Sequence, residues 1–188
     1  MNVFVLDENP RKAARMMCDK HIPKMIVESY QMLGSALLRH GADPESMPLT
    51  KKGTPLKGGY PNHPCTIWSG ESSSNWWWLH KHAEALCCEY TLRFGKTHFC
   101  EQGIYDLAQL QIDDGDTSDY AWAEIPNIGF TPYAQAMPNE YKDDDAVTAY
   151  RRYYHSKSFA KWERGRPEPR WWHTWKYFPN DGLPEVKL

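Results

Sequence analysis

The chain has 188 residues, of which 41% are apolar, and a net charge of −2. A chain of this length is expected to form one domain around one core, here spanning residues 1–188. It lacks the roughly eighteen consecutive apolar residues of a membrane-spanning helix, and its start has neither the basic residues nor the apolar length of a signal peptide. The sequence therefore excludes a membrane protein and predicts a soluble, cytoplasmic one.

The cysteines and histidines give no sign of a metal site. Five cysteines, an odd number without even spacing, are typical of reduced thiols, so we expect no disulfides. Three closely spaced pairs of ligand-type side chains do not repeat the paired spacing of a structural zinc site. These pairs are Cys18 with His21, His63 with Cys65, and His80 with His82. We therefore expect neither a metal nor another cofactor.

The first residues, NVFVLD, are either a short strand or an extended lead-in that packs on the core, and we favour the lead-in. Asp7 or Asn9 can cap a helix that begins at Pro10, because a proline in the first turn loses no hydrogen bond. Pro23 then either kinks this helix or lies in the first turn of a new one.

The next stretches predict two long helices joined by a loop. Apolar residues at spacings of three, four and seven form a core-facing stripe that ends near Gly41; they are Ile22, Met25, Ile26, Leu33 and Leu37. Residues 41–64 are rich in proline and glycine, which is typical of a connecting loop. Ser72, Ser73 or Ser74 can then cap a second long helix that runs to Gly95.

Later helices are shorter. Residues 104–111 predict one helix, DDGDTSD at 113–119 an irregular loop, and residues 145–154 a helix capped by Asp143 or Asp144, with Val147 and Tyr150 or Tyr154 on its buried side. We expect a poorly ordered tail at 182–188. Because strand signals are too short for a sheet, the predicted fold is mainly α, a single-domain helical bundle with long loops.

Charge is unevenly distributed along the chain. Residues 101–145 are strongly acidic, with Lys142 as the only cation, whereas residues 150–177 interleave lysines and arginines with aromatic residues. Basic side chains neutralise phosphates and aromatic rings stack on unpaired bases, which favours a nucleic-acid surface. The alternatives are that the two segments neutralise each other, and that the aromatic residues pack on the core while the cations reach water.

Two stretches carry clustered polar groups. In CDKHIPKMIVESYQ (residues 18–31), helical spacing places His21, Lys24 and Glu28 on one face, where they form either a working site or a solvated face with one weak ion pair. In YPNHPC (residues 60–65), the prolines flank Asn62 and His63 and present them either to a ligand or within a structural turn.

The order of these motifs resembles the phage pyrimidine-dimer DNA glycosylase/AP lyase family of the endonuclease V type. The stretches that carry the resemblance are MNVF at the start, DKHIPK at 19–24, the segment 62–96 that begins NHPC, and YRRYYHSK at 150–157. The resemblance implies a small helical repair enzyme, in the host cytoplasm if phage-encoded. It also implies an N-terminal α-amine that forms a Schiff base with a damaged nucleotide displaced from the DNA stack, followed by β-elimination.

The resemblance assigns roles residue by residue. Asn2, or Met1 if it is retained, supplies the amine, and His21 stands where the family has a catalytic Glu, so Glu28 is the candidate replacement. Lys20 and Lys24 replace flanking arginines, and either lysine is an alternative Schiff-base amine. The expected nucleic-acid contacts are Lys20, Asn62, His63, Arg151, Arg152, Tyr153, Tyr154, Lys157 and Lys161.

Three functions therefore remain open. The leading expectation is an enzyme, a glycosylase with Schiff-base lyase activity on damaged or modified pyrimidines in duplex DNA. The second is a transferase or hydrolase that acts on nucleotides or modified bases with the same scaffold. The third is a non-enzymatic, phage-type helical protein that binds a partner through the acidic region 101–145.

Overall fold

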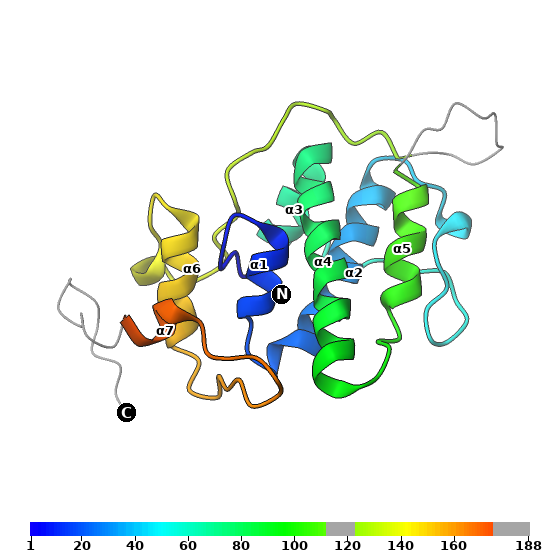
Figure 1. The fold of residues 1–188 in the computed structure, drawn as a ribbon. Helices are drawn as coiled ribbons and strands as arrows, with labels where there is room; N and C mark the ends of the chain where they lie inside the picture. The colour runs from blue at the N-terminus through cyan, green and yellow to red at the C-terminus, as the bar shows by residue number, and fades with distance from the viewer. Residues whose placement is uncertain (112–122, 175–188) are drawn as a thin grey trace.

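A computed structural model describes residues 1–111 and 123–174, and helix α2 (His21–Arg39) lies at the centre of their packing. It contacts α3 (Pro64–Glu71), α4 (Ser73–Phe94) and α5 (Glu101–Gln109). Figure 1 shows α1 (Pro10–Met16) in front, between α4 and α6 (Ala146–His155), with α7 (Arg170–Thr174) below α6. The other elements are two single-turn 3₁₀ helices, η1 (Pro44–Ser46) and η2 (Asn139–Tyr141).

No strand occurs in the described ranges, so the predicted mainly α fold is confirmed. The first six residues form the expected lead-in that packs on the core, although it turns at Phe4 and is not extended throughout, and Pro23 lies in the first turn of α2. The predicted loop at 113–119 and tail at 182–188 lie outside the described residues. Within 1–111 and 123–174, no helix combines the length and apolarity required to cross a membrane.

Polar side chains set where the helices begin. The Asn9 side chain accepts hydrogen bonds from the Arg11 and Lys12 backbone amides and so caps α1. Ser72 caps α4 in the same way, and Gly95, with a φ of 65°, ends it. Both agree with the sequence.

One expectation about a helix start was wrong, and one helix was missed. Asp145, not Asp143 or Asp144, caps α6, because its carboxylate accepts from two backbone amides of the first turn. Helix α3 was not predicted at all. Its cap is the ring Nδ1 of His63, which accepts from the Cys65 amide, with Pro64 in the first turn. Histidine is not a usual capping residue, so this start gave little signal.

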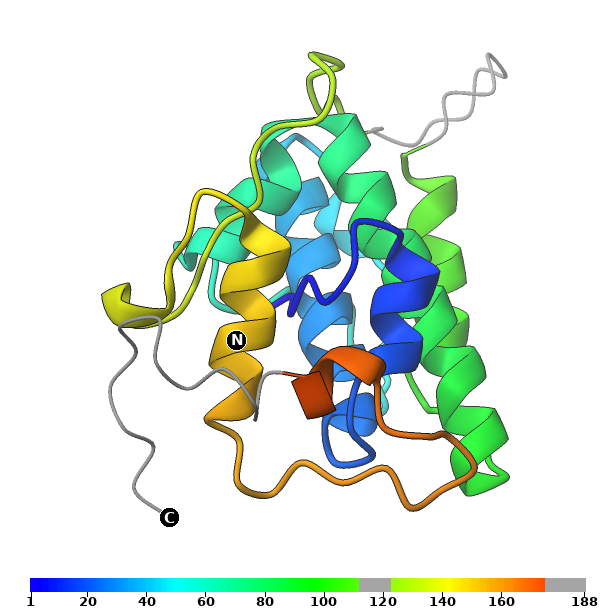
Figure 2. The same ribbon diagram turned by 60° about the vertical axis from the view of Figure 1, so that its left-hand side comes forward.

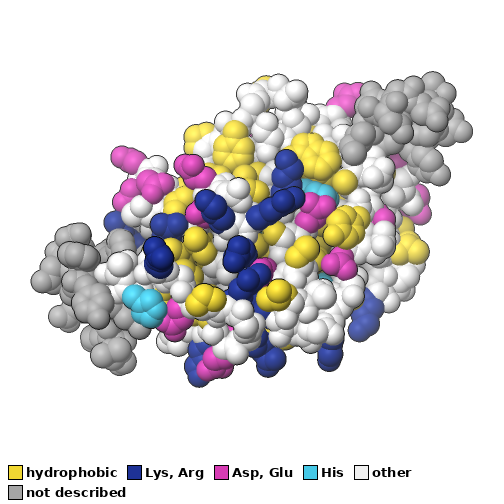
Figure 3. All heavy atoms as spheres, viewed as in Figure 1, with side chains coloured by type: hydrophobic (Ala, Val, Ile, Leu, Met, Phe, Trp, Pro, Cys, Tyr) yellow, Lys and Arg dark blue, Asp and Glu magenta, His cyan; other side chains and the backbone are white. Residues whose placement is uncertain are grey.

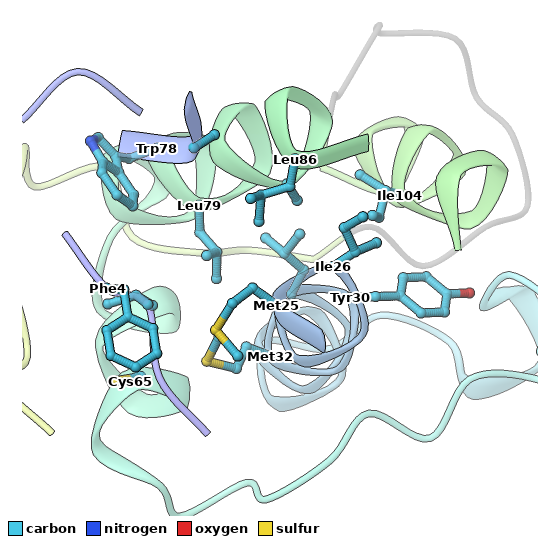
Figure 4. Packing of buried hydrophobic residues seen from close by; sticks show 14 of the residues in the cluster. Phe4, Met25, Ile26, Tyr30, Met32, Cys65, Trp78, Leu79, Leu86 and Ile104 are labelled. Carbon is cyan, nitrogen blue, oxygen red and sulfur yellow. The ribbon is translucent and has the colours of Figure 1, made fainter. Parts of the chain in front are cut away.

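The stripe predicted from the sequence forms the core of the bundle. Ile22, Met25, Ile26, Leu33 and Leu37 are all buried. Figure 4 shows Ile26 of α2 pointing toward Leu86 of α4 and Ile104 of α5. At Gly103, a Cβ would lie 2.5 Å from the Tyr30 hydroxyl oxygen, so only glycine lets α5 lie this close to α2.

A buried ion network joins the C-terminal segment to α4. Glu89, 4% exposed, accepts hydrogen bonds from Arg93 and Arg166, and Arg93 also pairs with Asp19 at 3.1 Å. Burial opposes the charge on Glu89, but its hydrogen bonds with Arg166 and Arg93 outweigh burial and lower its pKa. Figure 2 shows residues 156–169 crossing from the end of α6 to the end of α4.

We expect Glu89→Gln to lower the free energy of unfolding by roughly 3 kcal/mol, because buried Arg93 then keeps only Asp19 as a carboxylate partner and Arg166 loses its ion pair. Urea unfolding followed by circular dichroism measures this. Glu163→Gln is the matched control, since its ion pair with Lys161 is exposed and should be worth less than about 1 kcal/mol. Equal losses in the two variants would contradict the role given to the network.

His82 makes the core sensitive to acid. Its ring is 1% exposed and stacks on Trp78 at 5.1 Å between centroids, and neither ring nitrogen has a hydrogen-bond partner among the described residues. Burial lowers its pKa from 6.5 to about 3. The unfolded chain therefore binds this proton first, and stability falls as the pH drops from 6.5 toward 3.

His82→Phe keeps the stacked ring but removes the titrating group. Between pH 6 and pH 4, we expect its free energy of unfolding to fall less steeply than that of the wild type, by up to about 1.4 kcal/mol per pH unit. The measurement is the free energy of unfolding against pH. The exposed His173→Gln variant is the control and should follow the wild-type slope. A His82→Phe slope that equals the wild type's would show that the buried imidazole is not responsible.

Candidate active site

The start of the chain is held in place by the Asn2 side chain. Its Oδ1 accepts hydrogen bonds from the Val3 and Phe4 amides, and its Nδ2 donates to the Ala136 carbonyl at 2.8 Å. Phe4 has a φ of 42°, so the backbone turns sharply there while its ring is buried. These contacts direct Met1 and the Asn2 nitrogen toward α2.

The Glu28 carboxylate contacts both of these nitrogens. The Asn2 backbone N–H donates to Glu28 Oε2 at 2.9 Å, and the Met1 amine lies 3.8 Å from the same oxygen. On the other side, Lys24 Nζ lies 3.6 Å from Oε1. The Glu28 side chain is only 13% exposed, so the carboxylate is largely shielded from water between an α-amine and a lysine.

Glu28 borders two hollows. One, of about 220 Å³, is lined from the lead-in, α2 and the C-terminal segment by Met1, Asn2, Phe4, His21, Lys24, Met25, Glu28, Tyr153, Lys157 and Phe159. The other, of about 360 Å³, is lined by Met1, Lys24, Val27, Glu28, Gln31 and Tyr60. We call them the inner and the outer hollow; the amine, Lys24 and Glu28 are common to both.

His21 lines the inner hollow, but its ring is almost entirely buried against neighbouring side chains. It is 4% exposed, stacks on Phe4 at 4.7 Å between centroids, and its Nδ1 lies 2.8 Å from the Tyr154 hydroxyl oxygen. Burial, and then the positive charges of the three lysines 24, 157 and 20, lower its pKa to about 4. At neutral pH it is an uncharged ring, whereas Glu28 provides the negative charge beside the amine.

Lys24 and Lys157 line the inner hollow, and Lys20 lies beside it. Lys24 and Lys20 are exposed, and the Lys20 ammonium lies 4.6 Å from the centre of the Phe159 ring. Lys157 lies 3.6 Å above the Tyr153 ring, which orders both side chains. Three cations at one opening make it attractive for a phosphate backbone.

Other residues expected at a nucleic-acid surface have partners within the protein. Arg151 donates to the Leu6 carbonyl and pairs with Asp7, Arg152 pairs with Asp143 at 3.2 Å, and Lys161 pairs with exposed Glu163. The Arg152–Asp143 pair joins the acidic and basic segments, so part of their charge is neutralised within the fold.

Tyr154 was wrongly expected on the surface. Its side chain is fully buried, and its hydroxyl accepts a hydrogen bond from the Cys18 amide and contacts His21, so it cannot stack on a base. Of the YPNHPC pair, Asn62 is exposed, whereas His63 caps α3. Burial and then the positive charge of the N-terminal amine lower the pKa of His63.

Sequence reasoning gave no role to several exposed residues. Phe159 lines the inner hollow and Tyr60 the outer one. Both lie in stretches that the sequence singled out, 150–177 and 60–65, but neither was itself assigned a contact. Arg11, Lys12 and Arg15 are exposed on α1, and lysines and arginines gather on this face of the molecule (Figure 3). None of these three lines either hollow. Among the described residues, no group of three or more side chains is arranged to hold a metal.

An α-amine fixed against a shielded carboxylate, on a helical scaffold with a lysine-lined opening, defines a site suited to amine-nucleophile chemistry on an anionic substrate. The family model for pyrimidine dimer DNA glycosylases matches residues 1–102. The chain therefore belongs to the pyrimidine dimer DNA glycosylase family, which confirms the resemblance found in the sequence. No curated protein and no solved structure matches the chain.

We expect the His21 ring to titrate near pH 4, so nuclear magnetic resonance should show a neutral imidazole at pH 6. Lys157→Met should raise this pKa, because a nearby positive charge that opposes protonation is removed. Lys161→Met is the control and should leave the titration unchanged, since Lys161 does not line the inner hollow. An imidazole that titrates near 6.5 would contradict its burial.

Proposed function

We propose that the protein is a DNA glycosylase and Schiff-base lyase that acts on damaged or modified pyrimidines in duplex DNA through its N-terminal α-amine. The observation that carries this proposal is the position of the amine, 3.8 Å from Glu28 Oε2. The family match favours this reaction over the nucleotide transferase or hydrolase and over the non-enzymatic binding protein that the sequence left open.

Glu28 serves the reaction whether or not Met1 is removed. If Met1 is present, its amine is the nucleophile beside the carboxylate. If Met1 is cleaved, the Asn2 nitrogen becomes the α-amine, and it already lies 2.9 Å from the same oxygen. The Met1 amine and the Asn2 nitrogen both lie against Oε2 of the shielded Glu28, whereas the Lys20 and Lys24 side chains are exposed, so the α-amine is the better-placed nucleophile.

In the proposed reaction the amine nitrogen bonds to C1′ of the damaged nucleotide while the bond from C1′ to the base breaks. The base leaves with the electron pair and takes up a proton. Glu28 accepts a proton from the amine and returns it to O4′ as the sugar ring opens to an imine. Loss of a C2′ proton then expels the 3′ phosphate, which breaks the strand.

The other residues in the inner hollow, and Lys20 beside it, bind and position the substrate in this proposal. Lys20, Lys24 and Lys157 hold phosphates on either side of the target nucleotide, and this contact weakens as salt rises. His21 takes the place of the family Glu in sequence but not its charge. It acts as a positioning residue, because its stacking on Phe4 holds the lead-in that carries the amine.

We expect borohydride to trap a covalent adduct with DNA that carries an abasic site, and strand cleavage to occur on ultraviolet-irradiated DNA. Glu28→Gln should lower the rate of adduct formation at least a hundredfold, because the proton transfer that accompanies attack loses its carboxylate. The control is Glu45→Gln, an exposed carboxylate on η1 that lines neither hollow.

Peptide mass spectrometry of the trapped adduct identifies the attacking nitrogen. Attachment at Met1 or Asn2 supports the α-amine, whereas attachment at Lys20 or Lys24 would overturn that assignment and leave the lyase reaction intact. If no adduct forms with abasic-site DNA, the lyase reaction itself is wrong.

A further inference from the structure

The loop that precedes α3 is fastened directly onto α2. The Ser35 hydroxyl accepts from the Gly59 amide at 2.8 Å and donates to the Gly59 carbonyl, and the Arg39 guanidinium donates to the Pro61 carbonyl. Gly58 has a φ of 68°, and a Cβ there would lie 2.2 Å from the Ser35 hydroxyl oxygen. The loop is therefore packed as closely against α2 as sterics allow, and three hydrogen bonds hold it there.

Tyr60 lies at the tip of this loop in a strained conformation. Its φ of 50° is unusual for a bulky residue, and a residue before proline ordinarily adopts an extended backbone. This conformation does not serve to bury the ring, since Tyr60 is 68% exposed. Strain that the surrounding contacts maintain without a packing benefit is typical of functional positions.

The ring lies beside the amine and the carboxylate. Tyr60 lines the outer hollow together with Met1, Lys24 and Glu28. On the other side of the same three groups, Phe159, 37% exposed, lines the inner hollow. Other exposed aromatic residues, such as Phe99 and Tyr105, line neither hollow.

We propose that Tyr60 is a stacking residue that inserts against the bases beside the lesion and keeps the duplex open while the target sugar lies over the α-amine. This inference rests on the proposed function. Attack at C1′ requires the nucleotide to leave the regular stack, and an aromatic ring that replaces a lost base neighbour compensates for the unstacking. A water-exposed ring on a fastened loop, in the same hollow as the nucleophile, meets this need without movement of the loop.

The test compares Tyr60→Asn with wild type on duplex DNA that contains a non-cleavable tetrahydrofuran abasic analogue next to 2-aminopurine. Asparagine tolerates the left-handed backbone, so the loop keeps its shape while the ring is lost. The wild type should raise the 2-aminopurine fluorescence as the base unstacks. Tyr60→Asn should lose most of this rise, and Tyr60→Phe should restore it.

Cleavage provides a second readout. On duplex DNA with a true abasic site, Tyr60→Asn should react roughly ten- to a hundredfold more slowly, which is the effect of losing one stacked base. On a single-stranded abasic oligonucleotide, which needs no opening, the two proteins should react at equal rates. Tyr105→Asn, on α5 away from both hollows, is the matched control and should behave as wild type on both substrates.

The fluorescence readout needs no chemistry, so it separates the two proposals. Equal fluorescence rises in wild type and Tyr60→Asn overturn the stacking role, whether or not a covalent adduct forms. Equal losses of rate on duplex and single-stranded DNA also overturn it, because they indicate damage to the amine site instead. Failure of the wild type to form any adduct contradicts the Schiff-base reaction but not the stacking role.

Discussion

The contact between Glu28 and the first two backbone nitrogens of the chain determines the geometry of the candidate site. A shielded carboxylate is unfavourable without partners, and the α-amine, the Asn2 N–H and Lys24 supply them. In return, the carboxylate determines where the amine lies. The interactions that order the start of the chain are therefore the same ones that prepare the proposed reaction, so the site needs no further rearrangement to bring nucleophile and carboxylate together.

The sequence was sufficient to predict elements whose signals are local. Periodicity identified the buried stripe of α2 and placed Lys24 and Glu28 on one face, and side-chain caps located the starts of α1 and α4. It could not decide whether His21 or Glu28 meets the amine. That contact joins residues 26 positions apart through an extended lead-in without periodicity of its own. Tyr60 and Phe159 were missed for the same reason, since only the fold brings them to the hollows.

Helix α6 shows how two kinds of sequence argument can disagree. Helical spacing placed Val147 and Tyr150 or Tyr154 on the buried side; both tyrosines are fully buried, whereas Val147 is only partly buried. The family motif instead assigned Tyr154 to DNA. The physical pattern was right because the orientation of a helix is set by what it buries, whereas a motif match carries no information about which neighbouring tyrosine faces the core. Tyr153, one position earlier, is the tyrosine that reaches the inner hollow.

The buried ion pair between Glu89 and Arg166 holds part of the candidate site in place from outside the family-matched region. It fastens to α4 a segment that lies beyond the matched residues 1–102 and that supplies Lys157 and Phe159 to the inner hollow. The groups proposed for bond breaking and one wall of the recess thus come from separate stretches of the chain. Substitutions in that wall can therefore change the shape and charge of the inner hollow while the amine and Glu28 keep their positions.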